Sequence, residues 1–172
     1  MFTNEQAEYL IKLPKKILEN DLLIDQIQIE QKYPFSKKFI LGSPSDFEFT
    51  FLLDVNQSEK KVLKVSLHYQ EDQSKIGLLR VDFNGTHKNP ETIHEDLPEK
   101  FHKYAGKWFD YNDHHIHFYV QNYKPLAWAL PLIDDEFPIK DIKNNQDVGD
   151  SFLSFCERIN LITKIKLDGI LI

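Results

Sequence analysis

Two segments of the chain alternate apolar and polar residues with the two-residue period of a β-strand, and they constrain the fold more than any other feature. They span residues 78–84 and 114–120. Their apolar members are Leu79, Val81, Phe83, Ile116, Phe118 and Val120. Successive side chains of a strand point to opposite faces, so these residues can hold both strands on one core. The polar side chains then lie together on the other face.

The polar face of these two strands carries groups that bind metals. His115 and His117 are neighbours on one face of their strand, and Arg80 and Asp82 alternate in the same way on the other strand. If both strands belong to one antiparallel sheet, the four side chains share a surface. Imidazole with a carboxylate suits zinc, and also iron, copper or nickel, whereas calcium and magnesium prefer oxygen ligands. We expect zinc, at about one ion per chain.

A structural zinc site usually has four protein ligands, and the sequence offers a matching set. The expected ligands are Asp82, His87, His115 and His117. The nearby residues that could replace one of them are Asp110, Asp113 and His102. The alternative interpretation is a polar patch that holds no metal.

Three further residues are expected to contribute to binding at this surface: Arg80, Tyr119 and Asp113. Tyr119 continues the alternation of the histidine strand, which would bring it to the same face as His117. Arg80 could stabilise phosphoryl charge. Its alternative role is an ion pair with Asp82 or another carboxylate.

The pattern of the whole chain predicts an α+β fold. Strands are expected at residues 36–41, 47–55, 61–69, 76–83 and 126–130, with 165–167 and 170–172 as a last strand or docked tail. The links between the early strands are short, which favours antiparallel pairing. We expect a mostly antiparallel sheet of roughly five to seven strands, flanked by N-terminal and C-terminal helices. Residues 1–172 are expected to form a single domain.

Helix signals are found near both ends of the chain and once in its middle. Asn4 can cap a first helix that is interrupted near Pro14 and resumes over residues 17–18. A second helix is expected over residues 149–161, with Asp147 or Asp150 as its cap. The long insertion 85–113 can hold a short helix around residues 98–104. A long connection in a compact domain is usually functional.

Composition limits the class of protein. With 172 residues, 41% of them hydrophobic, the chain can bury a substantial core without disulfides. Its one cysteine, Cys156, lies in an apolar helical stripe and is expected to be a small core residue. The sequence contains neither a charged-then-apolar leader nor an apolar run of membrane-spanning length. We therefore expect a cytoplasmic protein with no membrane partner.

The net charge of −6 opposes direct binding to nucleic acid, because such binding depends on neutralising phosphates. The basic pairs at 15–16, 37–38 and 60–61 are short and are expected on solvated faces or turns. An acidic chain is instead suited to a basic protein partner.

Four short motifs support a family resemblance. They are R-x-D at residues 80–82, H-x-N-P at 87–90, H-x-H-x-Y at 115–119 and W-A-x-P-L at 128–132. Together they resemble those of a group of small, poorly characterised proteins of bacteria and their mobile elements, a group that implies no established reaction. In size, acidity and Lys/Asn/Ile-rich usage the chain also resembles phage proteins of low-GC Gram-positive bacteria. Some anti-CRISPR proteins of this kind are zinc-containing inhibitors of the effector nuclease.

Three function classes remain open. The preferred one is a zinc-stabilised binding protein that inhibits a basic, nucleic-acid-handling defence protein such as a CRISPR effector nuclease, with no catalytic residue of its own. The second is a metal-dependent or histidine-based nuclease or phosphoesterase, in which His115 or His117 is the general base or a metal ligand. The third is a cupin-like oxygenase or isomerase. Such barrels carry glycine-rich turns, and this chain has only six glycines.

Overall fold

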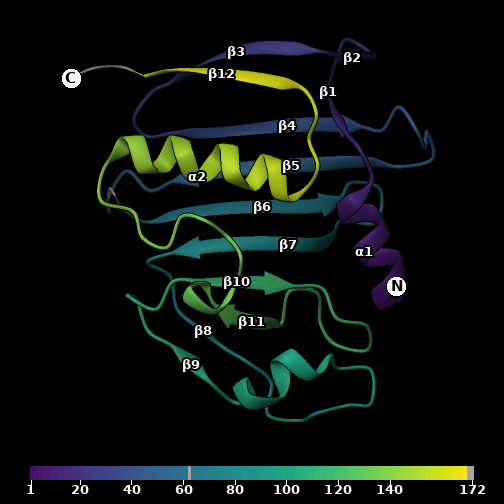
Figure 1. The fold of residues 1–172 in the computed structure, drawn as a ribbon, viewed down its shortest axis with the longest axis vertical. Coiled ribbons are helices and arrows are strands. Elements are labelled where there is room, and N and C mark those ends of the chain that lie inside the picture. Colours follow the sequence, from purple (N-terminus) through teal and green to yellow (C-terminus); the bar gives the residue numbers. More distant parts are fainter. Residues whose placement is uncertain (62, 170–172) are drawn as a thin grey trace.

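The computed structural model of the chain describes residues 1–61 and 63–169. Within them, the main sheet has eight strands: β1 (Lys16–Glu19), β2 (Leu22–Ile24), β4 (Ser36–Gly42), β5 (Thr50–Gln57), β6 (Val65–Glu71), β7 (Ile76–Phe83), β10 (His115–Phe118) and β11 (Trp128–Pro131). Their spatial order is β11-β10-β7-β6-β5-β4-β1-β2, and all neighbouring pairs are antiparallel (Figure 1). The predicted α+β class and antiparallel sheet are confirmed, and the strand number is slightly higher than expected.

Two small sheets and four helical segments complete the described chain. Strand β3 (Gln26–Gln31) pairs in parallel with β12 (Lys164–Gly169), and β8 (His87–Lys88) pairs antiparallel with β9 (Trp108–Phe109). The helical segments are α1 (Asn4–Lys12), η1 (Glu99–Tyr104), η2 (Leu132–Asp134) and α2 (Asn145–Arg158). The short helix predicted in the insertion is η1. Of the predicted C-terminal segments, 165–167 lies in β12 and 170–172 lies outside the described residues.

The core lies between the main sheet and the helices α1 and α2, which cover the same face of the sheet (Figure 1). The strands bury alternate residues on this face, as the sequence pattern predicts. The fully buried members include Leu53, Val55, Leu67, Val81 and, from α2, Phe152 and Phe155. The opposite face of β5, β6 and β7 carries half-buried polar residues such as Asp54, His68 and Arg80. The candidate site lies at the β10 end of this polar face.

The N-terminal segment differs from its prediction in two respects. Thr3, not Asn4, caps α1, because its hydroxyl accepts from the Gln6 amide while the Gln6 side chain accepts from Thr3 N in a capping box. The helix does not resume after Pro14, and residues 16–19 form β1 instead. A two-residue turn of Asn20 and Asp21, both with positive φ, leads from β1 into β2. Asparagine and aspartate tolerate this conformation and favour tight hairpins.

Helix α2 begins earlier than predicted. Its cap is Asn144, whose side chain accepts from the backbone amide of Asp147, so neither Asp147 nor Asp150 is the cap. Within α2, Cys156 is buried in the core as predicted. In the part of the chain that the structure describes, no helix combines the length and apolar character required to cross a membrane.

Lys15 is buried rather than solvated, which corrects the prediction for the basic pair 15–16. Its side chain has no exposed surface, and Nζ donates to the carbonyls of Leu10 (2.9 Å), Ile11 (3.0 Å) and Leu13 at the end of α1. Nζ also lies 5.2 Å from the ring centroids of both Phe51 and Tyr69. Lysine can satisfy the free carbonyls at a helix C-terminus, and this role explains its burial. Burial lowers the pKa of Lys15 to about 7.

Candidate metal centre

Strand pairing brings the predicted residues of β7 and β10 together. His115 lies opposite Asp82, and His117 lies opposite Arg80. Residues directly opposite each other in an antiparallel pair share a face, so these four side chains occupy one surface of the sheet, as predicted. On the other side of β10, Ala129 of β11 lies opposite His117. The small alanine side chain leaves room above this part of the sheet.

Asp82, His115 and His117 form a buried group that could hold a metal ion. One ligand atom from each residue lies within 4.8 Å of those from the other two. The Asp82 Oδ2 atom is 3.0 Å from His117 Nε2 and 3.8 Å from His115 Nε2. His115 is fully buried, and His117 and Asp82 are only 4% and 5% exposed. Two imidazole nitrogens and one carboxylate oxygen therefore converge on a small volume that is closed to bulk water.

Backbone carbonyls fix the orientation of both imidazole rings. His115 Nδ1 is 2.7 Å from the Asp113 carbonyl oxygen, and His117 Nδ1 is 2.9 Å from the Leu126 carbonyl oxygen. A carbonyl only accepts, so each Nδ1 carries a hydrogen. In the neutral ring of His115, the Nε2 lone pair is therefore directed into the group. His117 Nε2 instead donates to Asp82 Oδ2 at 3.0 Å, and a bound metal ion would replace this hydrogen. Metal-binding histidines usually have their other ring nitrogen held by an acceptor such as a carbonyl. His115 Nε2 is buried and has no hydrogen-bond partner within the described chain.

Arg80 is bound to the carboxylate of this group. Its Nε donates to Asp82 Oδ1 at 2.9 Å, and its Nη2 lies 2.7 Å from Oδ2. The ion pair considered for Arg80 from the sequence is therefore confirmed. Burial by itself would raise the pKa of Asp82, but hydrogen bonds from His117 and Arg80 and the charge of Arg80 hold that pKa well below its ordinary value. The carboxylate is ionised at neutral pH.

The protonation of His115 also suits a ligand. Burial, together with the neighbouring His117, lowers the pKa of His115 to about 4. Its ring is therefore neutral at physiological pH, with a lone pair available on Nε2. A cation between the three ligand atoms would satisfy this lone pair and the carboxylate together.

The antiparallel pair β8–β9 covers the three-residue group. Residues 89–107 connect its two strands, and the pair is called the hairpin below. His87 lies opposite Phe109 in the hairpin, and both rings face the sheet. The Phe109 ring centroid is 4.7 Å from that of His115, and the His87 centroid is 4.5 Å from that of His117. His87 Nε2, however, lies 2.9 Å from the Ala127 carbonyl oxygen and donates to it. His87 therefore lies beside the group without belonging to it, and its role as fourth ligand stays a prediction.

Asn89 fastens the hairpin to the edge of the main sheet, a role that the sequence analysis missed. Its side-chain amide donates to the Ala129 carbonyl and accepts from the Ala129 amide, both at 2.9 Å. These two bonds replace those that a further strand would make with β11. The same amide donates to the Tyr104 carbonyl at 3.0 Å. The H-x-N spacing thus places the side chains of His87 and Asn89 against the edge of β11 that pairs with no further strand. This spacing is the sequence signal from which the role of Asn89 could have been predicted.

The other predicted residues have different positions. The Asp113 carboxylate accepts from the Asp110 amide in an exposed turn, so Asp113 orients His115 through its carbonyl only. Tyr119 follows the last residue of β10, and its hydroxyl donates to the Phe2 carbonyl at 2.6 Å. Tyr119 therefore holds the N-terminal segment and is not beside the histidines, because the alternation ends with the strand. His102 donates within its own turn, to the Leu97 carbonyl.

Comparison with known families places the chain among proteins of unknown function. The family model DUF6978, described as a family of unknown function, matches residues 2–161. The chain belongs to this family. The matched region of this DUF6978 member includes Asp82, His115, His117 and the hairpin above them. No curated protein and no solved structure is significantly similar to the chain.

Proposed function

We propose that this DUF6978 member is a zinc-stabilised binding protein. The observation that carries the proposal is the convergence of two imidazole Nε2 atoms and one carboxylate oxygen in a buried group, with both Nδ1 atoms held by carbonyls. Zinc accepts nitrogen and oxygen ligands in this ratio. His115, His117 and Asp82 would hold the ion, and His87 is the nearest further imidazole. A rotation of the His87 ring away from the Ala127 carbonyl would complete a four-ligand structural site.

The burial of the group favours a structural ion over a catalytic one. A hydrolytic zinc needs an open position that substrate and water can reach. Here His115 has no exposed surface, and the hairpin with Phe109 lies above it. The ion would instead link β7, β10 and the hairpin, which are distant in sequence, and so stabilise the long insertion.

We further propose that the protein acts by stoichiometric binding to a basic, nucleic-acid-handling protein, such as a CRISPR effector nuclease of a bacterial host. The net charge of −6 favours a basic protein surface over a polyanion.

The competing function is a metal-dependent or histidine-based nuclease. Arg80 is the observation in its favour, because its side chain is 42% exposed beside the candidate metal ligands. Against it, Arg80 Nε and Nη2 already bind the two carboxylate oxygens of Asp82 and are not free for a phosphate.

One paired assay distinguishes these functions. Purified protein is incubated with labelled RNA or DNA, with and without zinc or manganese, and in parallel is titrated into a cleavage reaction of an effector nuclease. Binding predicts no cleavage by the protein alone, and inhibition that saturates near one protein per effector. Multiple-turnover cleavage that His115→Ala abolishes, and that the exposed-site control His94→Ala retains, would replace the proposal by the nuclease.

A further inference from the structure

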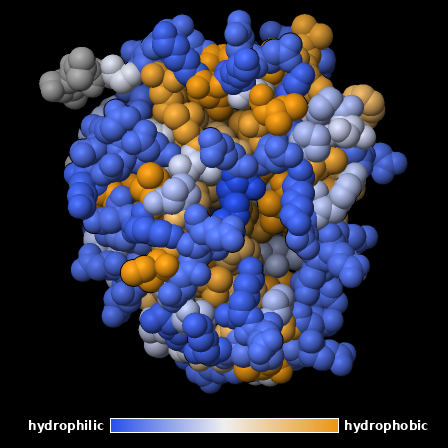
Figure 2. All heavy atoms as spheres, viewed as in Figure 1, coloured by the Kyte–Doolittle hydropathy of each residue, from blue (hydrophilic) through white to orange (hydrophobic). Residues whose placement is uncertain are grey.

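A hollow with an apolar floor opens on the helix-covered face of the sheet, opposite the candidate metal centre. Phe118 follows His117 in β10, so its side chain points to the other face of the strand. Two adjoining cavities of about 460 and 430 Å³ lie there, and both are lined by Lys100, Glu136 and Arg158. Figure 2 shows apolar atoms in a depression between hydrophilic rims on this side of the molecule. Cavities of this size are typical of small-molecule sites.

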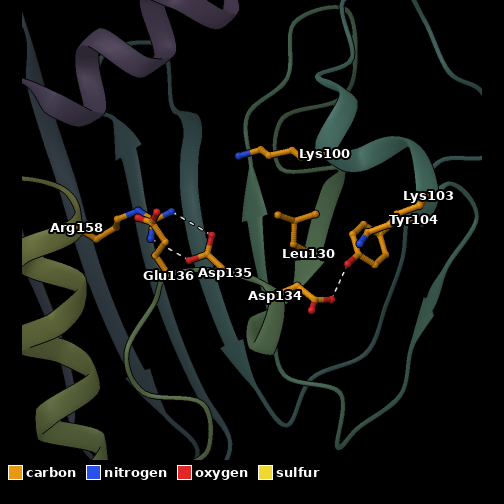
Figure 3. A pocket seen from close by; sticks show the side chains of 8 residues that line it. All are labelled: Lys100, Lys103, Tyr104, Leu130, Asp134, Asp135, Glu136 and Arg158. Carbon is orange, nitrogen blue, oxygen red and sulfur yellow. Dashed lines mark hydrogen bonds and ion pairs between the residues drawn. The ribbon is translucent and has the colours of Figure 1, made fainter.

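The floor of the hollow is formed by side chains that an aliphatic or aromatic group could contact. Leu79 and Phe118 are paired across β7 and β10, and Phe101 of η1 packs edge-to-face on Phe118 at 5.5 Å between ring centroids. Ala7 and Ile11 of α1 form one wall. Leu130 of β11 forms the floor of the second cavity (Figure 3).

Four of the eight charged side chains on the rim form two ion pairs. Arg158 donates to both carboxylate oxygens of Asp135, at 2.9 and 3.1 Å, and Lys12 binds Glu8 at 2.6 Å. On the far rim, Asp134 accepts from the Tyr104 hydroxyl (Figure 3). The two ion pairs occupy Arg158 and Lys12, so these cations are not free to bind a ligand.

Lys100 and Arg158 are the cations that line both cavities, and of these two only Lys100 has no ion pair among the described residues. Lys103 lines only the second cavity, with Nζ 5.0 Å from the Tyr104 ring centroid. Lys100 Nζ lies 4.1 Å from the Phe118 ring centroid and 5.1 Å from that of Phe101, and its ammonium points into the hollow (Figure 3). Within residues 1–61 and 63–169, no carboxylate lies within ion-pair distance of this ammonium. Burial lowers the pKa of Lys100, which reflects the loss of water around its charge. The carboxylates of Asp135, Glu8 and Glu136 act on this charge only from beyond ion-pair distance, so a bound anion would stabilise the partly desolvated ammonium.

We propose that the hollow binds a small amphiphilic carboxylic acid, with its carboxylate on Lys100 and its apolar part on Leu79 and Phe118. Lys100 presents one ammonium beside the apolar floor, which matches one carboxylate, whereas a phosphate would need several donors and Arg158 is already held by Asp135. Glu136, exposed on the opposite rim, repels the carboxylate and so fixes its orientation toward Lys100. This site is independent of the zinc proposal, because it lies on the other face of the sheet.

The test uses the full chain and a matched series of eight-carbon probes: octanoate, 1-octanol and octylamine, with acetate as a probe that lacks the apolar part. Isothermal titration should show saturable binding of octanoate to one site per chain. We expect the uncharged, cationic and short probes to bind at least about tenfold more weakly, as one charge-assisted bond and an apolar contact each contribute. Lys100→Gln should weaken octanoate binding by about tenfold or more. Lys143→Gln, an exposed control, should not change it.

The proposal is overturned by any of four results. These are equal affinity for all three eight-carbon probes, tighter binding of octylamine, unchanged octanoate binding in Lys100→Gln, or no saturation by octanoate at millimolar concentration. The wild-type probe series decides the question by itself if the Lys100 variant loses structure by circular dichroism.

Discussion

Replacing the buried Lys15 by methionine should make the variant lose stability relative to the wild type as the pH rises. Burial lowers the pKa of Lys15 to about 7 in the folded chain, against about 10.4 for an unfolded lysine. Between these two pH values the unfolded chain binds more protons than the folded chain. The free energy of unfolding of the wild type therefore increases with pH across this window. Methionine does not titrate, so the Lys15→Met variant lacks this contribution to the pH dependence of its unfolding free energy.

The magnitude follows from the two pKa values. Each pH unit within the window contributes up to about 1.4 kcal/mol. Between pH 7 and pH 9 the wild type should gain about 2 kcal/mol relative to Lys15→Met, because at pH 7 the folded lysine is only half deprotonated. At pH 7 the difference in unfolding free energy between wild type and Lys15→Met is small, because two effects of the substitution oppose each other. The variant avoids burying a charge but leaves the carbonyls of Ile11 and Leu13 without their donor.

The assay is urea unfolding at pH 7 and pH 9, followed by far-ultraviolet circular dichroism, for the wild type, Lys15→Met and Lys37→Met. Lys37 is exposed on β4, and its variant should differ from the wild type by less than about 0.5 kcal/mol at both pH values. If the difference between wild type and Lys15→Met is the same at pH 7 and pH 9, the folded chain retains the ammonium. The carbonyls of α1 and the two aromatic rings would then outweigh the cost of burial, and the reasoning would be wrong.

Three further predictions concern the candidate centre and the core. His117→Ala should lower the melting temperature by about 5–10 °C, and chelator should lower that of the wild type equally but leave the variant unchanged; the exposed-histidine control His94→Ala should behave as the wild type. Asn89→Ala should cost about 3 kcal/mol in chemical unfolding, since it leaves buried backbone groups of β11 unpaired, and an equal loss in the exposed control Asn112→Ala would contradict this role. Burial raises the pKa of the Cys156 thiol, so a thiol reagent at pH 8 should modify it slowly in the folded chain and at once in urea; fast labelling without urea would show that the helix packs loosely.

The sequence predicts the parts of the fold that depend on local periodicity. The alternation in β7 and β10 assigns Asp82, His115 and His117 to one face, and antiparallel pairing makes them neighbours. The strands β1 and β2 are only four and three residues long, so their periodicity is too short to recognise. Their signal is the Asn20–Asp21 turn rather than the strands themselves.

The features of the site that the sequence did not predict depend on backbone positions, which no side-chain pattern encodes. The carbonyls that orient His115 and His117 belong to Asp113 and Leu126. Leu126 has φ +60°, a conformation that leucine rarely adopts, so a propensity argument would not place its carbonyl there. The burial of Lys15 has the same origin, because its partners are helix carbonyls and not opposite charges. Sequence identifies candidate ligands, whereas their orientation depends on the folded backbone.

Elemental analysis tests the metal centre most directly. The protein is purified without an affinity tag and without chelator, and its zinc, iron, copper and nickel contents are measured by mass spectrometry beside those of Asp82→Asn and His115→Ala. We expect about one zinc per wild-type chain and a large loss in both variants, because each variant removes one of the convergent ligands. Less than about a tenth of an equivalent of any transition metal in the wild type would contradict the account, and the buried histidines and aspartate would then form a metal-free polar network.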